Sequence, residues 1–458
     1  MAFEIDRKAS IMNKIKTVHD KNQISALCVN ETTIPGVVNH KPSIAVLNDN
    51  EMLLFTLHRH YEEDAHGGPC QVCHTVMYHS YDGGLTWGKG RHMPFKGYEA
   101  SASVIDGVIF VQTHLYPDMF DNDFDNCIAL LYRSEDNGET WTETRFTPEF
   151  FGINSNIVLC MSRNLIKLPD NLIIGFVWSM GKHQYRVKSV DKGRNWSADI
   201  VEDGDIKFKE GTYRSVMAEA VTFITPSKRL MAVARVELSN LADANIPYLY
   251  KAKPFDTDEG DGMLLIESND CGLTWHAVRG LGYGGMMYPS VVYLDEKRFV
   301  LTYTLRSAAA SVGAPYRHIG MQAIIGTEED DGSFSIDFDN DIIILDDKTP
   351  DEIMTSDGYG MTKTDSKGVL ITPCCYAVAK DEYKRMIQSG ECFKNAEAFY
   401  SLYTETGKAD VYKGPDVEWW NSSTQEWKKV IIHECACQLG MIHYKSKVIK
   451  WRIEKYEK

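Results

Sequence analysis

The sequence contains no run of 18 apolar residues, and its first residues, MAFEIDRKASIMNK, lack the apolar stretch of a secretory signal. We therefore expect no membrane-spanning segment. The chain as written is expected to be cytoplasmic, or periplasmic or secreted if a signal has been removed. Low-complexity stretches are also absent from the 458 residues, so disorder is not expected to dominate.

Positive charge is scarce as well. The chain has 49 Lys and Arg residues against 64 Asp and Glu residues, which gives a formal net charge of −15. Nucleic-acid binding needs clustered cations that neutralise phosphates, so nucleic acid is not an expected partner. An acidic substrate remains compatible with this balance, because a few arginines in one pocket can bind an anion.

The eleven cysteines do not have the dense spacing of a small disulfide scaffold, and most are expected to be reduced and buried. Two groups have spacings that could hold zinc: Cys70 with Cys73, and His433 with Cys435. Neither group supplies four ligands by itself. We therefore expect that no cofactor is required. Structural zinc or calcium is possible, but the sequence does not support it.

An eight-residue pattern occurs four times and determines the fold prediction. The copies begin at intervals of 54, 55 and 79 residues, and intervals of 40–55 residues are typical of propeller blades. Their sequences are Ser80-Tyr-Asp-Gly-Gly-Leu-Thr-Trp87, Ser134-Glu-Asp-Asn-Gly-Glu-Thr-Trp141, Ser189-Val-Asp-Lys-Gly-Arg-Asn-Trp196 and Ser268-Asn-Asp-Cys-Gly-Leu-Thr-Trp275.

The pattern has a physical interpretation as a tight turn. An Asp side chain can accept hydrogen bonds from nearby backbone amides, and Gly adopts the positive φ that such a turn needs. The Trp then presents a large apolar face to a neighbouring strand. We expect these segments to stabilise the fold and not to take part in catalysis.

Pairs of apolar, period-2 segments accompany the repeats and indicate antiparallel strands. Six such pairs predict six blades, and the segment from Val430 to Lys458 leaves a seventh open. The pairs span residues 42–57, 100–113, 160–177, 218–235, 288–306 and 359–375.

The eight-residue segments resemble the Asp boxes of the sialidase superfamily. The resemblance implies an all-β protein: a six-bladed β-propeller (seven blades being the alternative) of four-stranded antiparallel blades. We treat residues 1–458 as one domain, in which residues 1–37 could close the last blade.

In such a propeller, the first strand of each blade begins at the substrate-binding face and the second strand returns to it. Aromatic, His, Arg and carboxylate side chains at these positions suit a glycan, because aromatic rings stack on sugars and arginines bind carboxylates. An oligosaccharide or polysaccharide is therefore the expected partner, and the oligomeric state is left open. The candidate residues at strand starts are His40, Glu99, Glu219, Tyr288 and Tyr359, and those after second strands are Arg59, His60, Asp64, His114, Arg235, Arg306 and Arg317.

The resemblance also implies catalytic roles. Glu219 and Arg235 resemble the family's Glu and second Arg, Tyr359 lies where the nucleophilic Tyr is expected, and Asp64 lies where the acid/base is expected. The sequence departs from the family at two arginine positions, which are occupied by His40-Lys41-Pro42 and by Tyr288. The prediction is therefore an exo-acting glycoside hydrolase of non-standard specificity for an acidic sugar.

Two alternatives remain. A polysaccharide lyase acting on uronic acids, similar to the propeller-type ulvan lyases, could use His114, Tyr288 or Tyr185, and Arg235 as base, acid and enolate-stabilising cation. A propeller that binds glycans without catalysis is the third class. In that case Arg235 would pair with Glu219 as a structural ion pair.

Overall fold

A computed structural model describes most of the chain. The described residues are 17–18, 27–35, 40–63, 69–115, 128–154, 157–179, 184–209, 216–242, 245–249, 261–282, 285–305, 320–346, 358–377, 417–421, 426–430 and 444–453. Within them no helix is long and apolar enough to cross a membrane.

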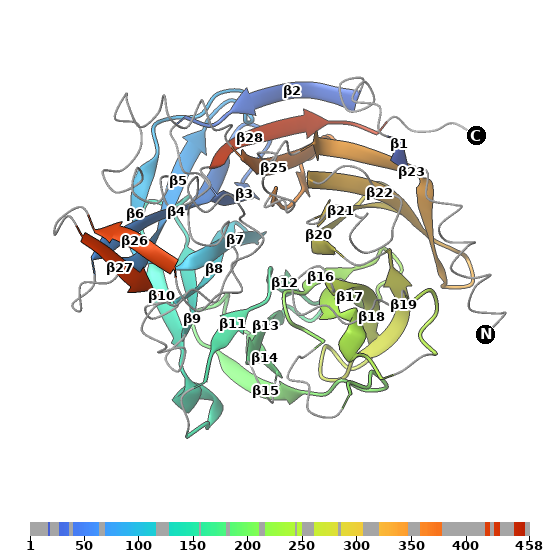
Figure 1. The fold of residues 1–458 in the computed structure, drawn as a ribbon. Helices are drawn as coiled ribbons and strands as arrows, with labels where there is room; N and C mark the ends of the chain where they lie inside the picture. Colours follow the sequence, from blue (N-terminus) through green and yellow to red (C-terminus); the bar gives the residue numbers. More distant parts are fainter. Residues whose placement is uncertain are drawn as a thin grey trace.

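Six antiparallel sheets surround a central axis (Figure 1). This confirms the predicted six-bladed propeller. The first three blades comprise β3 (His40–Val46), β4 (Met52–Glu63), β5 (Pro69–Ser80) and β6 (Arg91–Lys96); β7 (Tyr98–Ile105), β8 (Val108–Leu115), β9 (Ile128–Ser134) and β10 (Thr142–Phe146); and β11 (Leu159–Met161), β12 (Ile166–Lys167), β13 (Ile173–Ser179), β14 (Gln184–Ser189) and β15 (Ser197–Val201).

The remaining three blades follow the same order of strands, apart from the last. They comprise β16 (Val221–Ile224), β17 (Leu230–Glu237), β18 (Asp261–Ser268) and β19 (His276–Leu281); β20 (Met286–Tyr293), β21 (Arg298–Leu305), β22 (Gly320–Glu328) and β23 (Phe334–Asp346); and β24 (Lys363–Thr364), β25 (Leu370–Ala377), β28 (Tyr444–Trp451) and β2 (Cys28–Thr33).

The described segments outside these sheets are short. They are β1 (Thr17–Val18), which pairs in parallel with β23; the hairpin of β26 (Val417–Asn421) and β27 (Glu426–Val430); and the 3-10 helices Pro148–Phe151 and Leu238–Asn240.

The sixth blade combines a strand from the N-terminal part of the chain with one from the C-terminal part. The C-terminal strand β28 lies between β25 and the N-terminal strand β2, as Figure 1 shows in red, orange and blue. The alternative in which the C-terminal segment begins a seventh blade is therefore wrong, because β28 is the third strand of the sixth. Lys447 of β28 also forms an ion pair with Glu31 of β2, at 3.1 Å.

The four repeated segments form the same turn between the third and fourth strands of their blades. In each, the Ser hydroxyl donates to the Asp carboxylate at 2.8–2.9 Å and accepts from the Gly amide at 2.8–2.9 Å. The same Asp accepts the amide two residues beyond the Gly, as Asp136 does from Thr140 at 2.9 Å. The Gly residues have φ of 78–90°, a region that glycine favours.

The Trp of these turns packs against the preceding blade. Trp141, Trp196 and Trp275 each lie edge-on to an aromatic ring of that blade, namely Phe55, Phe110 and Phe176, at centroid distances of 6.0, 6.5 and 5.6 Å. The turns thus connect neighbouring blades. Antiparallel pairing places them at the opposite end of the blades from the starts of the innermost strands.

Candidate functional site

Four blades begin with a non-glycine residue in the left-handed region. These residues are Lys41, Glu99, Glu219 and Tyr288, with φ of 45–58°. In the first, second and fifth blades the strand pairing also shifts its register at this point. Bulges of this kind redirect side chains, and strained residues concentrate at functional sites. The shared feature therefore marks the ends of the innermost strands as a candidate site.

The side chains at these strand starts meet in one ion network. Glu99 accepts from Lys41 and, at 2.9 Å, from Nη1 of Arg163. Arg163 also contacts Glu219, with 3.0 Å between its Nη2 and Oε2 of the carboxylate. Arg235 donates from Nη1 to the same Oε2 at 2.8 Å. Four blades thus contribute to one chain of charges.

Aromatic rings cover this network. The guanidinium of Arg163 lies 3.7 Å from the centroid of the Tyr288 ring. The Lys41 ammonium lies 4.7 Å from the Tyr359 ring and 4.8 Å from the Tyr98 ring. The rings of Tyr288 and Tyr359 are 4.8 Å apart. Such stacking stabilises cations that have little contact with water.

Both carboxylates are ionised. Burial opposes the ionisation of Glu99, but Lys41 and Arg163 hold its pKa at about 2. Burial likewise opposes ionisation of Glu219, and Arg235 and Arg163 hold its pKa well below the usual range. The pKa of Arg163 is raised by the two carboxylates against the effect of burial. Among the described residues, the network therefore combines three cations with two ionised carboxylates.

Two other side chains are uncharged at neutral pH. Burial lowers the pKa of His114 to about 4, so its imidazole is neutral. Burial raises the pKa of Tyr288 to about 12, although Arg163 opposes this shift, so its phenol is protonated. The site thus offers a neutral imidazole and a protonated phenol beside its ion network.

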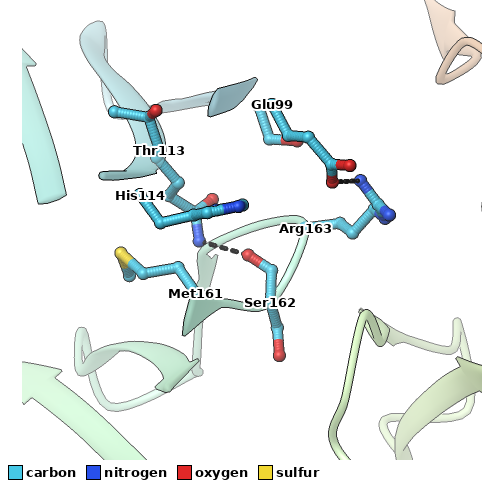
Figure 2. Close-up of a pocket in the computed structure, with 8 residues that line it drawn as sticks. Glu99, Thr113, His114, Met161, Ser162 and Arg163 are labelled. Atoms are coloured by element: carbon cyan, nitrogen blue, oxygen red, sulfur yellow. Dashed lines mark hydrogen bonds and ion pairs between the residues drawn. The ribbon is translucent and has the colours of Figure 1, made fainter. Parts of the chain in front are cut away.

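A pocket opens beside Glu99 and Arg163, where the second and third blades meet (Figure 2). Gln112 donates to the carbonyl of Ser162 at 2.7 Å, and its own carbonyl oxygen is buried. Within the described part of the chain, no partner is found for that oxygen, for Nε of Arg163 or for the Tyr288 hydroxyl. Buried polar groups are normally paired, so these three are available to a ligand or water. The lining residues are Glu99, Ser101, Gln112, Thr113, His114, Met161, Ser162 and Arg163.

The structure brings together seven of the residues predicted from the sequence: His40, Glu99, His114, Glu219, Arg235, Tyr288 and Tyr359. His40 packs against Tyr359 with 5.9 Å between the rings, and His114 packs against Tyr98 at 5.4 Å. The backbone of Arg59 and His60 lies in β4, but their side chains are outside the described residues. Asp64, Arg306 and Arg317 also lie outside them.

Tyr185, a candidate acid for the lyase alternative, is not part of this network. Its ring stacks on Phe151 at 4.3 Å and belongs to a hydrophobic core cluster. Its position in β14, the third strand of its blade, places it away from the innermost strands. The prediction of Tyr185 as an alternative acid is therefore wrong.

The metal candidates are not tested. Cys70 and Cys73 lie in β5 with their side chains undescribed, and His433 and Cys435 lie outside the described residues. Across the described ranges, no group of three or more His, Cys, Asp or Glu side chains could hold a metal ion.

The sequence reasoning missed Arg163, the residue at the centre of the network. The innermost strand of the third blade is interrupted between Met161 and Ile166, so its start is displaced along the chain. The signal was the polar triplet Ser162-Arg163-Asn164 between apolar residues, at the place where other blades begin. Lys41 was noticed only as a departure from an expected arginine.

No protein-family model and no curated protein matches the chain. Solved structures do match. A mutant of the NanB sialidase from Streptococcus pneumoniae is 12% identical, with 78% of this chain and 69% of that chain covered at a TM-score of 0.50.

The fold is that of a sialidase. NanB with optactamide gives the same TM-score of 0.50 at 12% identity, over 77% of this chain and 68% of that one. A leech intramolecular trans-sialidase has a TM-score of 0.49 at 13% identity, over 78% and 69%. At 12% identity, the likeness to NanB shows the fold alone and leaves the reaction to be argued from the site.

Proposed function

We propose that the protein is a carbohydrate-active enzyme that hydrolyses the glycosidic bond of an acidic sugar. The observation that carries the proposal is the buried guanidinium of Arg163, whose Nε has no partner among the described residues and which lies in one network with Lys41 and Arg235. Clustered cations with an unused donor favour an anionic ligand, since the anion accepts a charge-assisted hydrogen bond from that donor.

The substrate carboxylate is proposed to bind beside Arg163 and Arg235. Nε of Arg163 is buried and unpaired among the described residues, so it can donate to a ligand. Arginine suits this task because its planar donors match the two oxygens of a carboxylate. The Tyr288 and Tyr359 rings, 4.8 Å apart, place apolar groups beside these cations.

For hydrolysis we assign Tyr359 as nucleophile, with Tyr288 contacting the sugar. The phenol oxygen bonds to the anomeric carbon, its proton goes to a base, and the leaving oxygen takes a proton from an acid. Water then displaces the phenol oxygen, which recovers a proton. The Lys41 ammonium near the Tyr359 ring favours the phenolate that attacks. Asp64 is proposed as the acid/base, on the basis of the family resemblance.

A uronate lyase is the second candidate. It is supported by the neutral imidazole of His114 and the protonated phenol of Tyr288, which suit a base and an acid. Neutral His114 could take the proton next to the carboxylate, while protonated Tyr288 gives a proton to the leaving oxygen as the carbon–oxygen bond breaks. The electron pair of the broken carbon–hydrogen bond becomes the double bond of an unsaturated product. Arg163 and Arg235 would stabilise the intermediate enolate.

One substrate panel distinguishes these functions. The protein is incubated with sialosides, uronic-acid polymers and aryl glycosides, and products are followed by reducing ends and by ultraviolet absorbance of an unsaturated sugar. Reducing ends without absorbance support hydrolysis, and both signals together support the lyase. Glycan binding with neither signal would overturn both and favour a binding propeller.

A further inference from the structure

Two hydrogen bonds to the backbone of Met217 fix the segment that leads to Glu219. The Met217 amide donates to Oε1 of Gln184 at 2.9 Å, and the Met217 carbonyl accepts from the Ser162 hydroxyl at 2.6 Å. Met217 is fully buried. Glu219, two residues later, has a left-handed φ of 50°. Such a conformation persists only when the surroundings fix it, so these hydrogen bonds determine where the Glu219 carboxylate lies.

The side chain of Asp203 orients Gln184. An amide side chain has one accepting and one donating end. Nε2 of Gln184 donates to Oδ1 of Asp203, which leaves Oε1 facing the Met217 amide. The Val216 amide also points to Oδ1 of Asp203, at 3.4 Å. If the side-chain amide of Gln184 were flipped, its Nε2 would face the Met217 amide, and two donors would oppose each other.

Asp203 itself is fixed by the fourth blade. Asp203 follows β15, next to Glu202. The Glu202 amide donates to the Leu273 carbonyl at 2.8 Å, and the Glu202 carbonyl accepts from the Trp275 amide at 3.1 Å. At the next residue, Gly204, a Cβ atom would lie 2.2 Å from the Trp275 carbonyl oxygen. The segment therefore cannot shift without displacing the turn of the fourth blade.

Among the described residues, the groups that face Asp203 are one neutral amide, one backbone amide and one acid. β14 contributes Gln184, the segment before β16 contributes the Val216 amide, and Glu202 contributes a negative charge. Asp205, two residues after Asp203, pairs instead with His276, with 3.5 Å between Oδ1 and Nδ1. Burial raises the pKa of Asp203 to about 6, Glu202 raises it further, and the two amides oppose the shift.

We propose that Asp203, acting through Gln184, is a positioning residue for Glu219, and that this role needs the ionised carboxylate. An ionised acceptor forms a hydrogen bond about twice as strong as a neutral one. A protonated Asp203 has in addition an O–H that can donate to Gln184 and turn its amide. The geometry around Glu219 is then lost as the pH falls through about 6.

Asp203→Asn tests the proposal, because asparagine has the shape and hydrogen-bonding groups of protonated Asp. At pH 7.5 we expect the kcat/KM of this variant to be about tenfold below that of the unmodified protein. At pH 5 we expect the two proteins to have the same kcat/KM. The melting temperature should not fall, since the variant removes the burial of a charge. A purely structural role would lower stability instead. Wild-type kcat/KM at pH 7.5 would overturn the proposal.

Gln184→Met and Gln322→Met form a matched pair of controls. Both glutamines are buried, but Gln322 lies in β22 and accepts from Tyr303 at 3.1 Å, away from Glu219. We expect Gln184→Met to lower kcat/KM at pH 7.5 and Gln322→Met to leave it unchanged. Equal losses in both variants would mean that any buried glutamine matters, and would overturn the specific role.

The activity readout rests on the proposed function, so a second readout is independent of it. Hydrogen exchange of peptides containing Met217 should be faster in Asp203→Asn than in the unmodified protein at pH 7.5, and the same at pH 5. If the protein cleaves no glycan but exchange behaves in this way, the proposed function fails and the role of Asp203 stands. Equal exchange at pH 7.5 overturns the role of Asp203.

Discussion

At the scale of single residues, Arg163 holds the site together. It contacts both carboxylates and stacks on Tyr288, while Lys41 contacts Glu99 and Arg235 contacts Glu219. Removing one member of a buried ion network leaves a buried charge uncompensated. The free energy lost in this way exceeds the net stabilisation that the ion pair provides. The same residues are therefore expected to affect stability as well as substrate binding.

Arg235 and Tyr288 allow these two effects to be separated. Arg235→Lys keeps the charge but loses the planar donors, and we expect kcat/KM to fall at least about tenfold, or about 1.4 kcal/mol of transition-state stabilisation. Tyr288→Phe removes a hydroxyl without a partner among the described residues, so we expect a similar loss with little change in melting temperature. Both are measured by steady-state kinetics with thermal unfolding. Reduced stability with normal turnover would reassign Arg235 to the structural pair with Glu219.

Glu99 gives a prediction for acid stability. Its pKa is about 2 in the folded protein, below the ordinary 4.5, so the ionised form is stabilised by folding. The contribution is complete above pH 4.5 and is lost as the pH falls toward 2. We expect about 3 kcal/mol of unfolding free energy to be lost over this window. Denaturant unfolding of Glu99→Gln, already less stable at pH 7, should show a weaker acid dependence. Parallel pH profiles would show that Glu99 does not contribute.

Some of the site could be predicted from the sequence and some could not. His40, Glu219 and Tyr288 lie next to the alternating segments that predict the innermost strands, so period-2 alternation located them. Arg163 follows an interruption of the strand, where alternation gives no register. The pairing of Lys41 with Glu99 joins two blades, and no local pattern encodes a contact of that range.

At the scale of elements, the turns between third and fourth strands connect the blades. Their hydrogen bonds are local, from Ser, Asp, Gly and Thr within eight residues, which explains why the sequence predicted them directly. The burial of the Trp depends instead on the neighbouring blade. Trp275 is completely buried, whereas Trp141 is only partly buried.

This difference predicts unequal losses of stability. Trp275→Ala should lower the unfolding free energy by about 3–5 kcal/mol, as for other fully buried aromatic residues. Trp141→Ala should lower it by only about 2 kcal/mol, because less apolar surface is removed from the core. Activity per folded molecule should be unchanged in both, since the turns lie at the other end of the blades from the site. Lost activity with an unchanged melting temperature would place these turns in the site.

At the scale of the whole molecule, closure of the ring determines the number of blades. The sequence left six and seven open because the pairing of β2 with β28 joins residues more than four hundred positions apart. Loop closure over such a distance carries an entropic cost that only the completed ring offsets. The described pairing in five register positions, from Cys28 with Trp451 to Thr33 with Lys447, resolves the count.

Removing the N-terminal strand should therefore weaken the whole ring. Deletion of residues 1–36 takes away β2 and leaves the edge of β28 unpaired. At about 1 kcal/mol for each of about five backbone hydrogen bonds, we expect a loss of roughly 3–5 kcal/mol in unfolding free energy, with aggregation from the open edge. Deletion of residues 1–26 is the control, because it removes β1 and keeps β2. A synthetic peptide of residues 27–36 should restore the melting temperature of the longer deletion by adding a strand to the edge of β28. If both deletions melt alike, or if the peptide has no effect, the pairing of β2 with β28 does not stabilise the ring.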